Sequence, residues 1–149
     1  MGKFNILSTN HTSFTVANLD RSVSFYVDIL GFDLLNRSFR DMSFTEQVVG
    51  VLGAEIEVAY VQAPGHRLEL IQYHAPKDRG EVVSRPCDTG FAHVAFDVDD
   101  IDLVVAAVSK AGLRPLSKPV TVNAGPNTGG KAVYTRDPDG VTIEFIQKA

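Results

Sequence analysis

The ten residues HTSFTVANLD, numbered 11–20, recur in altered form as HVAFDVDDID at 93–102. The two copies lie 82 residues apart and share, position for position, a histidine, a phenylalanine, a valine and a final aspartate. In each copy apolar and polar residues alternate, and a polar residue then precedes an amphipathic stretch. This pattern predicts a short strand followed by a capped helix. Self-similarity at a fixed offset indicates two related modules.

A second repeat extends the correspondence. The octapeptide GHRLELIQ at 65–72 has the same layout as GVTIEFIQ at 140–147, and each begins with the glycine that ends a turn signal, APG or DPDG. Further strands are predicted at about 32–36, 55–62 and 67–73 in the first module, and at about 113–117, 131–136 and 141–147 in the second. The predicted fold class is α+β: one domain over residues 1–149, made of two βαβββ modules at about 8–74 and 90–148. A polar linker at 75–89 joins them.

The helix that follows the first strand of each module is predicted from its apolar stripe. Leu19, Val23, Tyr26 and Leu30 form the first stripe, and Ile101, Val104, Val105 and Val108 form the second. Gly31 and Gly112 follow these stripes and are expected to end the helices.

Residue parity assigns the strand side chains to faces, because successive side chains point to opposite sides of a sheet. The larger apolar residues share one face, which the helices are expected to cover. The other face gathers His11, Glu69, His93 and Glu144 beside small residues. A carboxylate among apolar neighbours requires a partner, since burying it alone is costly. Two imidazoles and two carboxylates on one concave face predict a divalent-metal site.

The overall composition restricts the possible partners. The chain has 149 residues and a net charge of −4, which argues against a general nucleic-acid surface. No apolar run approaches the roughly 18–20 residues that cross a bilayer, and the first ten residues lack the apolar core of a signal peptide. A single cysteine, Cys87, excludes an internal disulfide. We expect a cytoplasmic protein that binds neither nucleic acid nor membrane.

The motifs HTSFTV…SFYVDILGF, RLELIQ, HVAFDV and DPDGVTIEF together resemble the vicinal oxygen chelate superfamily. This superfamily includes glyoxalase I, methylmalonyl-CoA epimerase, extradiol dioxygenases, and fosfomycin and bleomycin resistance proteins. The resemblance extends from about His11 to Gln147. It implies paired βαβββ modules whose sheets form a cup around a metal ion, often in a homodimer.

The resemblance also implies roles for the four residues. The superfamily's metal positions fall on His11, Glu69, His93 and Glu144, and a His-Glu-His-Glu set is most similar to that of bacterial glyoxalase I. It implies one divalent ion (Ni, Co, Mn, Zn or Mg) and no organic cofactor. A small substrate with two adjacent oxygens would react through a metal-stabilised enolate, in a lyase or isomerase reaction. Glu144 is the first candidate for the base that moves the proton, and Glu69 is the second.

Two alternatives stay open at this point. An extradiol-type Fe(II) dioxygenase would use His11, His93 and Glu144 as ligands, and Tyr134 fits the spacing of its tyrosine. A non-catalytic protein that binds an antibiotic or another ligand is the second alternative. Glyoxalase I holds glutathione with an Arg and an Asn, and the corresponding positions here are Thr15 and Tyr73. This difference argues against a glutathione substrate.

Overall fold

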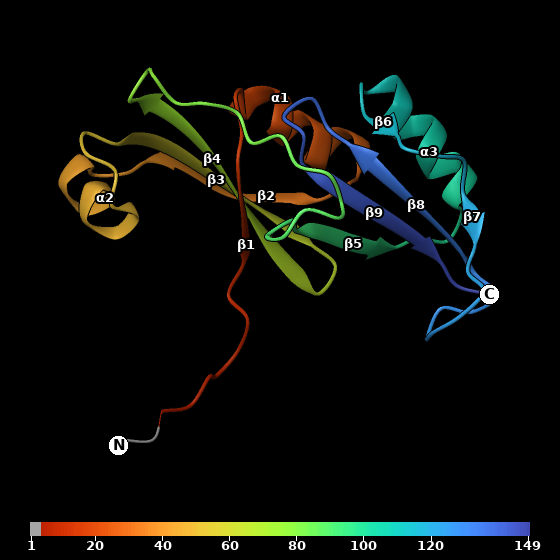
Figure 1. Cartoon of the computed structure of the whole chain (residues 1–149). Helices are drawn as coiled ribbons and strands as arrows, with labels where there is room; N and C mark the ends of the chain where they lie inside the picture. The colour runs from red at the N-terminus through yellow and green to blue at the C-terminus, as the bar shows by residue number, and fades with distance from the viewer. Residues whose placement is uncertain (1–3) are drawn as a thin grey trace. The chain divides into compact units, whose positions relative to one another are not determined.

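The structure, a computed structural model, describes residues 4–149 and divides into two compact units. Unit 1 runs to Asp78, and unit 2 comprises Arg79–Ala149. In unit 1 the elements follow in the order β1 (Thr12–Thr15), α1 (Leu19–Ser24), the π-helix η1 (Phe25–Ile29), β2 (Asp33–Phe39), α2 (Met42–Val49), β3 (Glu55–Ala63) and β4 (His66–Ala75) (Figure 1). Its sheet has the order β1-β4-β3-β2. β1 is parallel to β4 and the other pairs are antiparallel.

Unit 2 repeats this plan. Its elements are β5 (His93–Asp97), α3 (Ile101–Lys110), β6 (Arg114–Pro115), β7 (Val120–Thr121), β8 (Lys131–Arg136) and β9 (Thr142–Gln147). The strand order is β5-β9-β8-β6, β7 also pairs with β8, and β5 is parallel to β9. The α+β class and the βαβββ order in each half are confirmed. In residues 4–149 no helix is both long and apolar enough to cross a membrane.

The two faces of each sheet differ as residue parity predicts. In unit 1 Leu68 and Leu70 of β4 are fully buried, whereas Glu69 between them is only partly buried. In unit 2 Ile143 and Phe145 of β9 are buried on either side of Glu144. α1 contacts β3 and β4, and α3 contacts β9, so the helices lie over the apolar faces. The acids are on the uncovered faces.

A glutamine joins the last strand of each unit to the helix that follows its first strand. The Gln72 Oε1 of β4 accepts a hydrogen bond from the Leu19 backbone N–H at 2.6 Å. The Gln147 Oε1 of β9 accepts one from the Ile101 N–H at 2.9 Å. The first N–H groups of a helix have no partner within the helix. The same glutamine therefore satisfies the same orphan donor in both units.

The first predicted helix departs from a regular α-helix. Its second half is the π-helix η1, in which the Leu30 N–H donates to the Phe25 carbonyl. The wider turn changes which side chains face the sheet. Phe25 and Tyr26 are buried, whereas Val23 and Leu30 of the predicted stripe are only partly buried. A stripe with a 3.6-residue period cannot describe both halves of this helix.

The helix α2 was missed in the sequence because it has no apolar stripe that packs on a core. Asp41 caps it by accepting from the Phe44 N–H at 2.8 Å, and Gly50 ends it in the left-handed conformation, with φ 68°. Among its residues only Thr45 is buried, while Phe44 and Val48 are exposed. Without an apolar face that packs on the core, capping residues alone are a weak indication of a helix.

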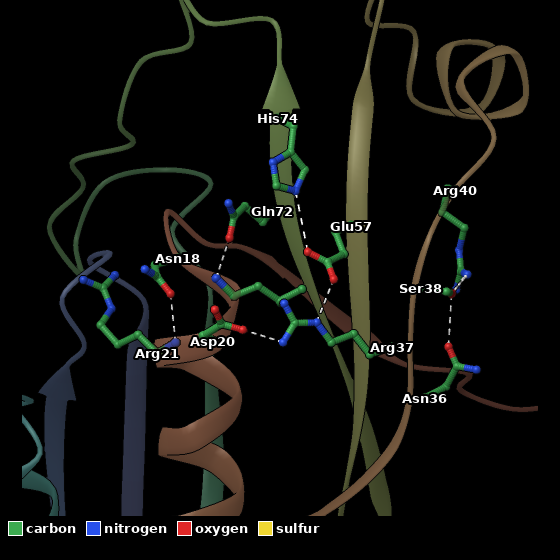
Figure 2. Close-up of polar contacts among 11 residues, drawn as sticks. Asn18, Asp20, Arg21, Asn36, Arg37, Ser38, Arg40, Glu57, Gln72 and His74 are labelled. Atoms are coloured by element: carbon green, nitrogen blue, oxygen red, sulfur yellow. Dashed lines mark hydrogen bonds and ion pairs between the residues drawn. The ribbon is translucent and has the colours of Figure 1, made fainter.

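A chain of ion pairs crosses the helix-covered face of unit 1 (Figure 2). Arg37 of β2 donates to Asp20 of α1 at 2.5 Å and to Glu57 of β3 at 2.7 Å. His74 of β4 lies 3.6 Å from the other Glu57 oxygen. The hydrogen bond from Arg37 lowers the pKa of Glu57 below its ordinary value. This network connects α1 to three strands of the sheet.

The glutamine caps lead to a prediction about stability. Gln72→Ala or Gln147→Ala leaves a partly buried helix N–H without an acceptor, which should lower the free energy of unfolding by about 1–2 kcal/mol. Urea denaturation at constant pH measures this change. Gln47→Ala is the matched control, because the Gln47 amide is exposed and bonds only to Ser43 of its own helix. If Gln72→Ala and Gln147→Ala lower the free energy of unfolding no more than Gln47→Ala does, the two glutamine caps do not contribute to stability.

Candidate functional site

The first candidate pair lies on the uncovered face of unit 1. His11 immediately precedes β1, and β1 runs parallel to β4 with Ser13 opposite Glu69. The His11 Nε2 is 3.2 Å from the Glu69 Oε2, and the two side chains are 30% and 13% exposed. The His11 Nδ1 is hydrogen-bonded to the Asn10 Oδ1 at 2.7 Å. An acceptor on one ring nitrogen fixes the tautomer and leaves Nε2 free to act as a ligand.

The second candidate pair has the same construction in unit 2. His93 begins β5, which is parallel to β9 and has Ala95 opposite Glu144. The His93 Nε2 is 3.1 Å from the Glu144 Oε2, and these side chains are 34% and 17% exposed. Both pairs thus have an imidazole nitrogen and a carboxylate oxygen at nearly equal separation, in a setting accessible to solvent.

A tyrosine accompanies each pair. Tyr60 of β3 lies directly across from Glu69, and Tyr134 of β8 lies directly across from Glu144. The Tyr60 hydroxyl donates to the Glu69 Oε1, and its ring meets the His11 ring edge-on at 5.7 Å. The Tyr134 ring is 4.9 Å from the His93 ring, and its hydroxyl is 3.4 Å from the His93 Nε2.

Tyr60 was missed in the sequence, although Tyr134 was noted. Tyr60 precedes Glu69 by nine residues and Tyr134 precedes Glu144 by ten, because the turns of the two hairpins differ in length. A search at one fixed spacing finds only one of them. Cross-strand pairing would have found both, had the strand register been known.

The phenols have raised pKa values in both units. Burial raises the pKa of Tyr60 above its ordinary value, and the hydrogen bond to the Glu69 carboxylate raises it further. For Tyr134, burial again comes first, followed by the negative charge of Glu144. Both tyrosines are therefore protonated donors at neutral pH.

The other histidines lie away from these faces. The His66 Nε2 is 2.8 Å from the Thr12 Oγ1, and His74 faces Glu57 in the ion-pair network. Glu46, which could also act as a base, accepts a hydrogen bond from the Gly53 N–H at 3.1 Å. Each of these residues has a structural partner, which leaves the two His–Glu pairs as candidate ligands.

The donor types of the pairs suit a divalent transition metal, because imidazole nitrogen and carboxylate oxygen both bind such ions. Each unit contributes two of the four residues. Among residues 4–149 the structure contains no group of three or more His, Cys, Asp or Glu side chains placed to hold one ion.

Comparison with known proteins agrees with this architecture. A family model described as the Glyoxalase/Bleomycin resistance protein/Dioxygenase superfamily matches residues 8–145. The chain belongs to this superfamily. The resemblance predicted from the sequence motifs is thereby confirmed, because this is the same group of proteins.

Individual members of the superfamily match over nearly the whole chain. A 2-epi-5-epi-valiolone epimerase from Actinomyces sp is 30% identical over 145 residues, which are 94% of this chain and 79% of that protein. A lactoylglutathione lyase from Haemophilus influenzae is 34% identical over 144 residues, which are 92% and 90% of the two chains. The crystal structure of a glyoxalase family protein from Bacillus cereus superposes with a TM-score of 0.85 at 25% identity, covering 99% and 97%.

The tyrosine contacts generate a prediction about titration. In metal-free protein, Glu69→Gln removes the negative charge that raises the pKa of Tyr60, so the phenol should ionise at lower pH than in the wild type. The pKa should stay above its ordinary value, because burial remains the larger cause. Ultraviolet absorbance of the phenolate, recorded from pH 8 upward, follows the ionisation.

The matched control for this titration is Glu57→Gln. Glu57 lies on the opposite, helix-covered face, where it binds Arg37, so its loss should leave the Tyr60 curve in place. An unchanged curve in Glu69→Gln would contradict the contact between Tyr60 and Glu69.

Proposed function

We propose that this chain is a divalent-metal-dependent enzyme, a lyase or isomerase that acts on a small substrate with two adjacent oxygens. His11, Glu69, His93 and Glu144 are its metal ligands. The observation that carries the proposal is the repetition of one His–Glu pair, with nearly the same geometry, in both units. Two relatives, an epimerase and a lyase, support this reaction type.

The four residues form a set with balanced charge. Two neutral imidazoles and two carboxylates carry two negative charges, which offset the charge of a divalent cation. Since each unit supplies one pair, the full set needs both units, from one chain or from two chains of a homodimer. A cation held by these residues would supply Lewis acidity, which would polarise a substrate carbonyl and make the adjacent C–H more acidic.

Glu144 is the better candidate for the base. Both oxygens of Glu69 have partners, since Oε2 is next to His11 and Oε1 accepts from Tyr60. The Glu144 Oε2 is next to His93, but its Oε1 has no hydrogen-bond partner among the described residues. A base needs a free oxygen within reach of the proton that it takes. We infer that the Glu144 Oε1 removes and returns the substrate proton while Glu69 holds its position.

The contacts of Tyr134 weaken the dioxygenase alternative. That alternative depends on one tyrosine upstream of the last ligand, but the repeat-related Tyr60 occupies the same cross-strand position in unit 1. Because a tyrosine occupies this position in both halves, the repeat explains Tyr134 without a dioxygenase role. Thr15 and Tyr73 argue against the glutathione conjugate that the name of the lyase relatives indicates.

Metal content tests the metal site. Protein purified without chelator or affinity-column metal should contain about one divalent ion per chain by mass spectrometry, and His93→Ala should lose it. His66→Ala is the control, because His66 is bonded to Thr12 and not to the candidate ligands. A wild-type protein that binds no divalent ion after anaerobic reconstitution would refute the proposal.

Deuterium uptake tests the role of Glu144. In D2O the metal-loaded protein should exchange a substrate C–H, and a panel of small 2-hydroxyketones and 2-oxoaldehydes followed by NMR identifies which compound exchanges. Glu144→Gln should slow this exchange by about 10²–10⁴-fold, the usual contribution of a positioned base. Tyr134→Phe is the control, because it keeps the carboxylate. Equal exchange in Glu144→Gln and the wild type would assign the base elsewhere.

A further inference from the structure

Two arginines flank Tyr60 on the same face as Glu69. The Arg40 guanidinium carbon is 6.0 Å from the centre of the Tyr60 ring, and that of Arg67 is 5.9 Å from it. Arg67 precedes Glu69 by two residues on β4, so both side chains point to one side. The Arg40 N–H donates to the Ile56 carbonyl, which places Arg40 at the end of β2 beside β3. Ring contacts of this kind fix the orientation of a guanidinium.

Arg40 and Arg67 contact Tyr60 without a carboxylate partner within residues 4–149, in contrast to the ion-paired Arg37 on the opposite face. Arg37, Arg85, Lys131 and Lys148 each form an ion pair with an aspartate or glutamate. No ion pair to Arg40 or Arg67 is found within residues 4–149. Arg40 donates to the neutral Ser38 hydroxyl, away from the ion pairs of Arg37 (Figure 2).

The charge on this face is therefore unbalanced. Glu69, the carboxylate of this face that belongs to the proposed metal set, would be offset by the cation that the set would hold, which leaves two guanidinium charges beside Tyr60. Arg40 is half-buried and Arg67 is exposed, and two positive charges beside the same ring favour the approach of an anion. A guanidinium also offers parallel N–H donors that match the two oxygens of an oxyacid group.

We propose that Arg40 and Arg67 form a subsite for an anionic oxyacid group of the substrate, a carboxylate or a phosphonate. The group lies on the substrate next to the pair of oxygens that reaches the metal. This inference rests on the proposed function, because the chelating oxygens place the substrate on this face. It adds a substrate class: the substrate is an anion whose charge is separate from its chelating group.

Three hydroxamates test the subsite, since each chelates a metal through the same two adjacent oxygens. Acetohydroxamate has an uncharged tail, succinic monohydroxamate ends in a carboxylate, and 3-phosphonopropionohydroxamate ends in a phosphonate. Their dissociation constants are measured by isothermal titration calorimetry on protein loaded with the metal that it retains on purification. We expect one of the two anionic ligands to bind at least ~10-fold more tightly than acetohydroxamate, as one charge-assisted contact provides. The tighter of the two identifies the oxyacid.

The arginine variants should remove this preference and nothing else. Arg40→Gln and Arg67→Gln should each reduce it, and the double variant should abolish it while acetohydroxamate binds within about twofold of the wild type. Arg67→Lys keeps the charge but loses the paired donors, so it should retain part of the preference. Arg21→Gln is the matched control: it removes one charge from α1, which covers the opposite face, and should leave the preference intact.

The outcomes separate the two proposals. Equal affinity for all three hydroxamates in metal-loaded wild type would overturn the anionic subsite and leave the metal enzyme standing. A preference that survives in the double variant would also overturn it. If the wild type binds no metal, the proposed function fails and the subsite fails with it. Arg67 is exposed, so Arg67→Gln should fold, which thermal unfolding checks.

Discussion

In each unit the first strand pairs in parallel with the last, and this pairing brings the histidine to the glutamate. A parallel pair cannot be closed by a tight turn and needs a long crossover that includes a helix. The helix must then cover one face of the sheet, which leaves the other face for polar side chains. His11 and Glu69 meet across β1 and β4 on that face, as His93 and Glu144 do across β5 and β9.

The last strand of each unit has different roles on its two faces. On the uncovered face it presents the glutamate, and three residues later, on the helix-covered face, its glutamine accepts from the first helix N–H. This bond fixes the start of the helix relative to the strand that carries the candidate ligand. The recurring Glu-x-x-Gln spacing in RLELIQ and VTIEFIQ thus has a structural reason for both residues.

Much of this arrangement could be predicted from the sequence because the repeat doubled every weak signal. A lone His11 or Glu144 would have had a plain structural explanation, but the matching positions in the second copy identified the strands and faces. The module boundaries at 8–74 and 90–148 and the single domain remain predictions. Features present in one copy only were missed. The helix α2 buries little, and η1 changes the turn of a helix without any change in its apolar content. Tyr60 has a counterpart in the second copy, Tyr134, but the correspondence could be found only from the strand register.

The two units are similar in backbone and different in the surroundings of their carboxylates, and this difference bears on the proposed chemistry. In unit 1 the Tyr60 phenol engages Glu69, and beside it lie two arginines that form no ion pair within residues 4–149. In unit 2 the Tyr134 phenol lies against His93, and one oxygen of Glu144 has no hydrogen-bond partner among the described residues.

A carboxylate with both oxygens engaged is suited to hold a fixed position, whereas one with a free oxygen can exchange a proton with a substrate. Cations beside a carboxylate favour the binding of an anion and stabilise the ionised carboxylate, which makes it a weaker base. The arginines lie beside Glu69, the carboxylate with both oxygens engaged, and this placement agrees with its proposed role in holding a fixed position. The repeat supplied two similar pairs, and the differences in the neighbouring side chains agree with the roles proposed for unit 1 in substrate recognition and for unit 2 in proton transfer.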